Sequence, residues 1–430
     1  MLLFDNFWNE YKTQIAQLRR IFLILERSYM IRNSEHKSIW KFCISLLKST
    51  CSKKPEINNK LLESIFVVIE KERLSGHTID SQRVLKSGVE VLMELSLYKD
   101  PFEALLIEKT KSFYIKKSIE QINKGNIKEY IAYIQAKFRD EHERLIAYLD
   151  PSTSPQIQST LEETLIKNHV KTLIGEGFIS LAEDNATTEL KTLYELLKSI
   201  KAINDLKKSW SDYLRKKGLS LLQAKKNSEE IVEDLITFKQ TTDCILLTSF
   251  ESDTDFKLSL KTSFENVLNS NANRSAEYVA RYLDMYLNTD AFKIVKKKSD
   301  EEIKSIIDRC MPLFRLIVNK DIFEAFYLRR LAKRLLFYKT VSSECEKYLL
   351  DKLKAECGSN YTRKAEAMFQ DMEIAQEFTE KFEKYTEAHP VSKPDFQFSA
   401  IVLTFGAWPF EAFIPIPLPK EVLSNHHIDC

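Results

Sequence analysis

Glycine and proline are scarce in this sequence, and their scarcity limits the possible folds. The 430 residues include only 8 glycines and 11 prolines, whereas average usage would give roughly 30 and roughly 20. Turn-rich β-sandwiches, β-barrels and dinucleotide-binding folds need many more glycines. The composition therefore favours long helices joined by short loops.

An excess of charge of one sign is also lacking. The 64 lysines and arginines nearly balance the 62 aspartates and glutamates, so the formal net charge is +2. The two signs are interleaved, as on solvated helix faces, and we expect no direct nucleic-acid partner. One basic run, Lys293 with residues 296–298, could touch an acidic partner or nucleic acid. The helix start at Ser299–Glu302 favours a solvated loop instead.

Disulfide spacing, a targeting segment and a membrane span are missing as well. The seven cysteines are an odd, irregularly spaced set without a CxxC pair, which is typical of free thiols in a reducing compartment. The chain start has neither a basic region nor a long apolar run. The longest apolar stretch, residues 65–69, is too short to cross a bilayer. We therefore expect a soluble intracellular protein without a membrane partner.

Motifs for catalysis are equally hard to find. The sequence contains no glycine-rich phosphate loop, no HExxH and no GxSxG. Paired carboxylates such as Glu229 and Glu230 are interpreted as solvent-facing residues of amphipathic helices. We therefore expect a protein that is not an enzyme, with no catalytic residues, no cofactor and no metal site.

Histidine clusters give only a weak metal signal. Five isolated histidines are interpreted as surface or loop residues: His36, His77, His142, His169 and His389. His426, His427 and Cys430 have a spacing that metal ligands could share. A disordered terminus is the simpler interpretation of that cluster.

Helical periodicity is nearly continuous along the chain. Apolar residues of the opening stretch recur at spacings of three and four, which predicts a helix of roughly six turns. These residues are Phe7, Trp8, Tyr11, Ile15, Leu18, Ile21, Phe22 and Leu25. Asn58 and Asn59 are candidate caps of a helix that carries residues 61–69. Further helices are predicted near residues 39–47, 81–98, 101–124, 126–149, 156–182, 188–216, 227–249 and 254–270.

Short polar breaks separate the predicted helices. The clearest loop is Asp150–Pro155, and further breaks are predicted at residues 74–77, 216–218 and 269–273. After the last polar break the stretch Phe396–Phe405 is rich in aromatic and β-branched residues, which makes it the only good strand candidate.

One helical block and the segments after it resemble the cullin family. Lys320–Tyr327 and Leu331–Leu336 resemble the signature helix at the start of the cullin homology region. Later blocks follow in the order and spacing of that family: Glu344, Glu346–Lys347, Lys352–Gly358, Tyr361–Thr362, Met368–Met372, Val402–Thr404 and Trp408–Pro409. Gly358 would end the second of these helices, because glycine readily adopts a left-handed conformation.

The N-terminal part is similar to the first cullin repeat, and to the fourth cullin subfamily in particular. The similar segments are Trp8, Ile21–Leu23, Glu26–Tyr29, Ser38–Trp40, Glu70–Arg73, Tyr98–Glu103 and Ala147–Asp150. The resemblance implies an all-α fold: an elongated stack of cullin-repeat bundles, then a four-helix bundle and one terminal β-strand. The implied domains are the repeats in 1–275, the bundle in 276–392, and a partial α/β segment with an unmatched tail in 393–430.

The resemblance also implies a function. A cullin is the non-catalytic scaffold of a ubiquitin ligase, which holds a substrate-receptor adaptor at one end and a RING subunit at the other. Proximity then accelerates ubiquitin transfer. The subfamily implies a β-propeller adaptor and a protein of the nucleus and cytoplasm.

The family's first helices, most of its RING-binding surface and its modifier-acceptor lysine are not matched, so no lysine of this chain inherits the acceptor role. The residues expected to form a partial adaptor-binding surface are Trp8, Tyr11, Gln14 and Leu18. The competing interpretation is that the apolar members simply pack in the core.

Two other functions remain as alternatives at this point. A helical-rod subunit of a vesicle-tethering complex would also consist of stacked helices with few glycines, although the block Lys320–Leu336 and the strand after it argue against that assignment. A helical nucleic-acid-binding protein is disfavoured by the net charge of +2.

Overall fold

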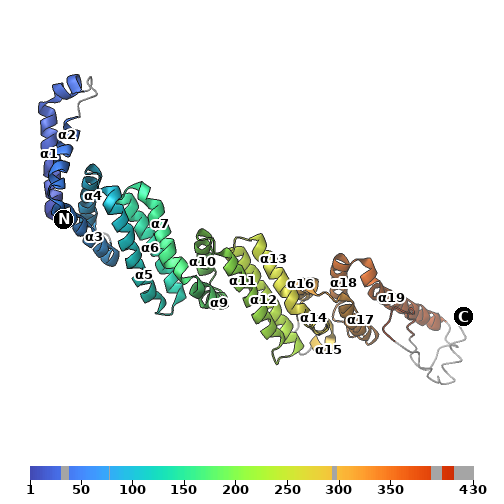
Figure 1. Cartoon of the computed structure of the whole chain (residues 1–430). Coiled ribbons are helices and arrows are strands. Elements are labelled where there is room, and N and C mark those ends of the chain that lie inside the picture. Colours follow the sequence, from blue (N-terminus) through green and yellow to red (C-terminus); the bar gives the residue numbers. More distant parts are fainter. Residues whose placement is uncertain (31–37, 77, 293–297, 389–399, 411–430) are drawn as a thin grey trace. The chain divides into compact units, whose positions relative to one another are not determined.

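The computed structural model describes residues 1–30, 38–76, 78–292, 298–388 and 400–410 (Figure 1). Nearly all of these residues are helical, and the described part contains no β-sheet. Its only β pairing is an isolated antiparallel bridge between Asn288 and Thr340. The all-α prediction is therefore confirmed. None of the described helices has both the length and the apolar content that a membrane span requires.

The chain forms two compact units. The first comprises Met1–Ser209 with Thr248–Phe250, and the second comprises Trp210–Leu247 with Glu251–Cys430. The predicted domain boundary after residue 275 falls inside the second unit and stays a prediction.

The first unit contains the helices α1 to α10. Their bounds are α1 Leu2–Ile21, α2 Ile39–Ser52, α3 Pro55–Ser75, α4 Ile79–Glu94, α5 Ala104–Ile122, α6 Ile127–Tyr148, α7 Ser154–Leu161, α8 Val170–Thr172, α9 Phe178–Glu183 and α10 Thr187–Ser199. Short π-helical segments occur at Leu25–Met30, Tyr98–Glu103, Glu162–Ile166 and Leu173–Gly177. Helices α5, α6 and α7 lie side by side (Figure 1).

The second unit contains most of α11 and α12 and all later helices. Their bounds are α11 Ile203–Leu222, α12 Ser228–Ser249, α13 Thr254–Asn269, α14 Ala272–Leu287, α15 Thr289–Phe292, α16 Asp300–Leu316, α17 Lys320–Leu336, α18 Ser343–Cys357 and α19 Ser359–Ala388. Helix α17 packs against α14 and α19, and α18 packs against α16 and α19.

Several helix ends agree with the local sequence signals. The side chain of Ser299 accepts a hydrogen bond from Glu302 N, and the Glu302 side chain accepts one from Ser299 N. This reciprocal pair satisfies two amides that α16 leaves free. Gly358 ends α18 at φ +88°, a value that side chains rarely tolerate. The predicted breaks at residues 74–77 and 269–273 also separate helices, apart from His77, which lies outside the described residues.

Other boundary predictions were wrong. Asn58 and Asn59 lie inside α3, which begins at Pro55 with proline at its first position. The predicted helix 188–216 is two helices, because α10 ends at Ser199 and Lys201 adopts φ +61°. The predicted break at 216–218 lies inside α11. A Cβ on Gly218 would lie 2.9 Å from the Val267 side chain, so this glycine permits close packing of α11 on α13.

The strand prediction remains open. Residues Phe396–Ser399 lie outside the described part, and Ala400–Thr404 have no regular secondary structure. The following residues 405–407 form a turn.

A buried ionic network joins helices of the first unit. The Glu141 carboxylate on α6 accepts hydrogen bonds from Arg73 Nε at 2.8 Å, Arg144 Nη1 at 3.0 Å and the Tyr114 hydroxyl at 2.6 Å. Glu72 accepts a bond from the Tyr148 hydroxyl at 3.1 Å and lies 3.7 Å from Arg144 Nε. Buried charges are tolerated only when they are paired in this way. The network therefore fixes the register of α3, α5 and α6 against one another.

Candidate functional site

Trp8 and Tyr11, two of the four predicted adaptor-binding residues, lie against neighbouring helices rather than in solvent. Trp8 is 1% exposed, its indole Nε1 donates to Glu90 Oε2 at 3.3 Å, and its ring meets Trp40 edge-on at 6.4 Å between centroids. The hydroxyl of Tyr11 donates to the backbone oxygen of Cys43 at 3.0 Å. Burial, helped by the thiols of Cys43 and Cys51, raises the pKa of Tyr11. These two side chains join α1 to α2 and α4.

Gln14 and Leu18 lie on the open side of α1. Gln14 is exposed, and its amide donates to Glu10 Oε1 at 3.3 Å on the same helix. Leu18 is 41% exposed. The structure thus separates the predicted set into one buried residue, Trp8, one half-buried residue, Tyr11, and two exposed residues.

An apolar surface continues from Leu18 to the end of α1 and beyond. We call it the α1 apolar end; it consists of Leu18, Ile21, Phe22, Leu23, Ile24 and Leu25, all exposed. Arg19 Nε pairs with the Glu26 carboxylate at 3.1 Å, which links α1 to the π-helical segment Leu25–Met30. Contiguous exposed apolar residues of this kind mark interaction sites more often than isolated ones. The sequence placed Leu18, Ile21, Phe22 and Leu25 on one apolar stripe and left open whether they pack in the core or form a surface.

A small cavity lies between α1, α2, α3 and α4. Its volume is about 180 Å³, and its lining is almost wholly apolar. The lining includes Phe4, Phe7, Trp8, Leu47, Cys51 and Leu61. The cavity offers no charged group for binding or catalysis.

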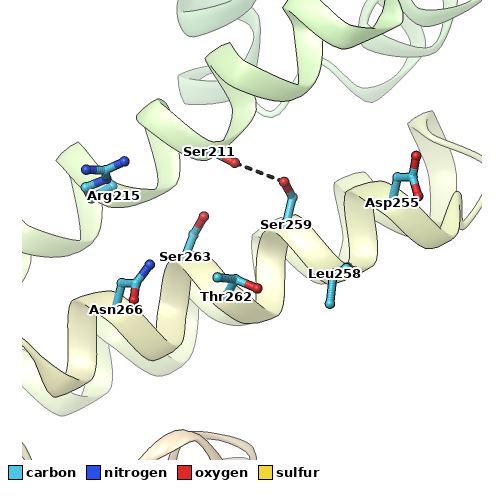
Figure 2. A pocket seen from close by; sticks show the side chains of 8 residues that line it. All are labelled: Ser211, Arg215, Asp255, Leu258, Ser259, Thr262, Ser263 and Asn266. Carbon is cyan, nitrogen blue, oxygen red and sulfur yellow. Dashed lines mark hydrogen bonds between the residues drawn. The ribbon is translucent and has the colours of Figure 1, made fainter.

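A polar groove lies between α11 and α13 in the second unit (Figure 2). Its volume is about 450 Å³, and the hydroxyls of Ser211 and Ser259 form a 2.9 Å hydrogen bond from one helix to the other. The remaining lining residues are Arg215, Asp255, Leu258, Thr262, Ser263 and Asn266. The small residues allow the close helix approach already seen at Gly218. Sequence reasoning missed the groove because its residues come from two helices that no motif links.

Helix α17 carries a buried charge, Arg334, which pairs with a buried carboxylate of α18. Arg334 is 1% exposed and pairs in a bidentate manner with Glu346 of α18, with Nε to Oε1 at 2.7 Å and Nη2 to Oε2 at 3.1 Å. It also pairs with Asp284 of α14, which Arg330 contacts at 2.8 Å. Burial alone lowers the pKa of Arg334, but the Glu346 carboxylate outweighs burial and raises it. Its partners lie on two other helices, so the local sequence gives no sign that Arg334 is buried.

The residues weighed for chemistry do not form a catalytic arrangement in the described part. His169 is half-buried, and its Nε2 lies 3.0 Å from Ser118 Oγ. That hydroxyl also donates to the Ile115 carbonyl on its own helix at 2.9 Å. Burial lowers the pKa of His169. The contact between His169 and Ser118 therefore links the segment Lys167–His169 to α5.

Other candidate residues are exposed or lie outside the described part. His142 is exposed. The residues outside the described ranges are His36, His77, His389, His426, His427, Cys430, Lys293, Lys296 and Lys297. Lys298 Nζ lies 4.7 Å from the Tyr286 ring centroid, a cation–π contact. Over the residues that the structure describes, no group of three or more His, Cys, Asp or Glu side chains could hold a metal ion.

Comparison with known proteins gives a consistent family. A family model described as the cullin alpha solenoid domain matches residues 2–379. The chain is similar to Cullin-4 of Dictyostelium discoideum, with 34% identity over 99% of this chain and 52% of the relative. It is also similar to Cullin-4A of Homo sapiens, with 31% identity over 98% of this chain and 55% of the relative. Cullin-3 of Dictyostelium discoideum shows 31% identity over 98% and 55%. The chain spans about half the length of the relatives that it matches.

Proposed function

The chain belongs to the cullin family, and from this premise we propose that it is a non-catalytic scaffold subunit of a cullin-RING ubiquitin ligase. The observation that carries the proposal is the family match over residues 2–379, which covers most of both helical units. The helical-rod tethering alternative loses its support, because no observation favours it over this match.

A scaffold acts by holding its partners at fixed positions, so its packing is its relevant property. Tethering an acceptor near a charged conjugating enzyme replaces a bimolecular encounter by an intramolecular one. The Glu141 and Glu346 networks support such a role, because buried ion pairs require one arrangement of the helices that carry them.

The α1 apolar end is the part of the chain best suited to an adaptor. Leu18 and its apolar neighbours are exposed, while Trp8 is buried and attaches α1 to α4 through its hydrogen bond to Glu90. Gln14 adds a hydrogen-bonding group at the edge of this surface. We propose a β-propeller adaptor as the partner here, a RING subunit as the partner of the C-terminal region, and the nucleus and cytoplasm as the place of action.

Binding measured with purified components tests this function. The chain is mixed with a β-propeller adaptor of the DNA-damage-binding type, and complex formation is followed by calorimetry and gel filtration. We expect a stoichiometric complex that Leu18→Asp weakens at least roughly tenfold, since a charge would enter the apolar contact. Absence of binding by a correctly folded chain would contradict the adaptor assignment.

A ubiquitin-transfer assay tests the scaffold assignment separately. The chain, a RING subunit and a charged conjugating enzyme are combined with and without the adaptor and its substrate receptor. We expect no ubiquitin chain formation from the chain and conjugating enzyme alone. Turnover by the chain without a RING subunit would show catalytic residues that the proposal denies.

A further inference from the structure

One carboxylate joins α19 to a segment that follows it much later in the chain. Asp371 Oδ2 accepts hydrogen bonds from Thr404 N at 2.7 Å and from Trp408 Nε1 at 2.7 Å. Asp371 Oδ1 accepts a bond from Thr404 Oγ1 at 2.6 Å. Both oxygens of the side chain are therefore used, and all three donors come from residues 404–408.

The segment itself is a tight turn built to meet this carboxylate. Ala407 N donates to Thr404 O at 3.2 Å, and Gly406 adopts φ +80°, which a side chain would disfavour. The turn brings Thr404 and Trp408 to the same side, where Trp408 is 7% exposed. Phe405, at the tip, is fully exposed. The indole therefore lies against α19 while the apolar tip points to solvent.

The chemistry of the contact favours an ionised aspartate. Burial raises the pKa of Asp371, but the bonds from Thr404 and Trp408 outweigh burial and lower it. Hydrogen bonds to a charged acceptor are about twice as strong as neutral ones. All three donors are neutral groups, so protonating or neutralising this one side chain weakens the whole set together.

We propose that Asp371 is a latch: its charge holds the turn Thr404–Trp408 against α19, and loss of that charge releases the turn. Asp371 is a positioning residue, since it acts through the turn. This role is separate from partner binding, because Asp371 controls a contact within the chain itself.

The test measures amide hydrogen exchange and chymotrypsin cleavage of residues 400–410 in the variant Asp371→Asn, made in the full chain. Asparagine keeps the size of the side chain but offers one acceptor oxygen in place of two, so at least one donor is lost. We expect amide hydrogen exchange of residues 400–410 to rise at least roughly tenfold, as expected when charge-assisted bonds are lost. Chymotrypsin should also cleave after Phe405 faster by a similar factor.

Matched variants separate the latch from a general loss of structure. Glu377→Gln changes an exposed acid on the same helix, paired with Lys381 at 3.7 Å, and should leave exchange of 400–410 unchanged. Thr404→Val and Trp408→Phe each remove one donor and should give smaller increases than Asp371→Asn. Exchange in the first turns of α19 should stay at its wild-type value in all variants.

Three outcomes would overturn the proposal. One is exchange of 400–410 in Asp371→Asn equal to that in wild type. Another is a wild-type segment that already exchanges as fast as an unprotected peptide. If Asp371→Asn unfolds α19, Thr404→Val decides, because it leaves the helix sequence intact; no local increase in that variant would reject the latch.

Discussion

Helices α1 and α17 have similar length and amphipathic sequences, yet they differ in how much of each is buried. Helix α17 buries seven of its 17 residues, including Phe323, Leu331 and Arg334. Helix α1 buries only three of its 20 residues, Asp5, Trp8 and Ile15. The same apolar spacing therefore produces an enclosed core helix in one case and a helix with an apolar surface in the other. The spacing predicts that a helix forms, but the packing decides whether its apolar residues become core or interface.

The largest expected effect in this comparison comes from Arg334. Replacing Arg334 by Ala leaves Glu346 buried without its partner, which costs about 3–5 kcal/mol of unfolding free energy. Urea unfolding followed by circular dichroism measures it. Arg329→Ala, an exposed arginine of the same helix, should change stability by less than about 0.5 kcal/mol. Equal effects of the two variants would contradict the buried pair.

Two single leucine-to-alanine variants, one in each helix, compare directly how much a leucine of α17 and a leucine of α1 contribute to stability. Leu331 of α17 is 0% exposed and Leu18 of α1 is 41% exposed. Leu331→Ala should therefore destabilise the protein by about 2–5 kcal/mol, and Leu18→Ala by about 0.5 kcal/mol or less. The same unfolding measurement serves both. A large loss from Leu18→Ala would place that residue in the core.

The pH dependence of stability separates buried from exposed acids. Burial raises the pKa of Glu141, but Arg73 and Arg144 outweigh burial and lower it below its usual value near 4.5. A lowered folded-state pKa stabilises the protein above the unfolded pKa, and this stabilisation is lost as pH falls through the folded pKa. Stability of the first unit should therefore decrease below about pH 4.5. Glu141→Gln should show a smaller decrease over that range.

Glu90 supplies the control with the smallest effect. Its pair with Lys12 of α1 is 3.1 Å long and has side chains 42% and 34% exposed. Glu90→Gln should change the unfolding free energy by about 1 kcal/mol or less, because exposed pairs contribute only about 0–1 kcal/mol. A loss of several kcal/mol in Glu90→Gln would contradict the exposed position of this pair.

The parts of the fold that sequence could predict are those set by neighbouring residues. The start of α16 at Ser299 and the stop of α18 at Gly358 depend on one turn of chain, so their signals were sufficient. The break at Gly218 was wrong because that glycine serves contact with Val267 on another helix. The burial of Arg334 was missed because its partners lie on α14 and α18.

The candidate site shows the same limit. Periodicity put Trp8, Tyr11 and Leu18 on one stripe, and Gln14 was added by family resemblance. The structure divides them, since the indole of Trp8 reaches Glu90, 82 positions later in the chain. Only such distant partners distinguish a core residue from a surface residue. The α1 apolar end follows from the exposure of Leu18 and its apolar neighbours in the structure, and sequence alone could not show that.

The most direct test of the account measures adaptor binding and stability together in one variant. Leu18→Asp combined with Phe22→Asp places two charges in the α1 apolar end, where both residues are exposed, at 41% and 48%. We predict that the unfolding free energy stays within about 0.5 kcal/mol of wild type, while affinity for a β-propeller adaptor falls at least roughly a hundredfold. Unchanged affinity in the folded variant would contradict the assignment of α1 as the partner-binding helix.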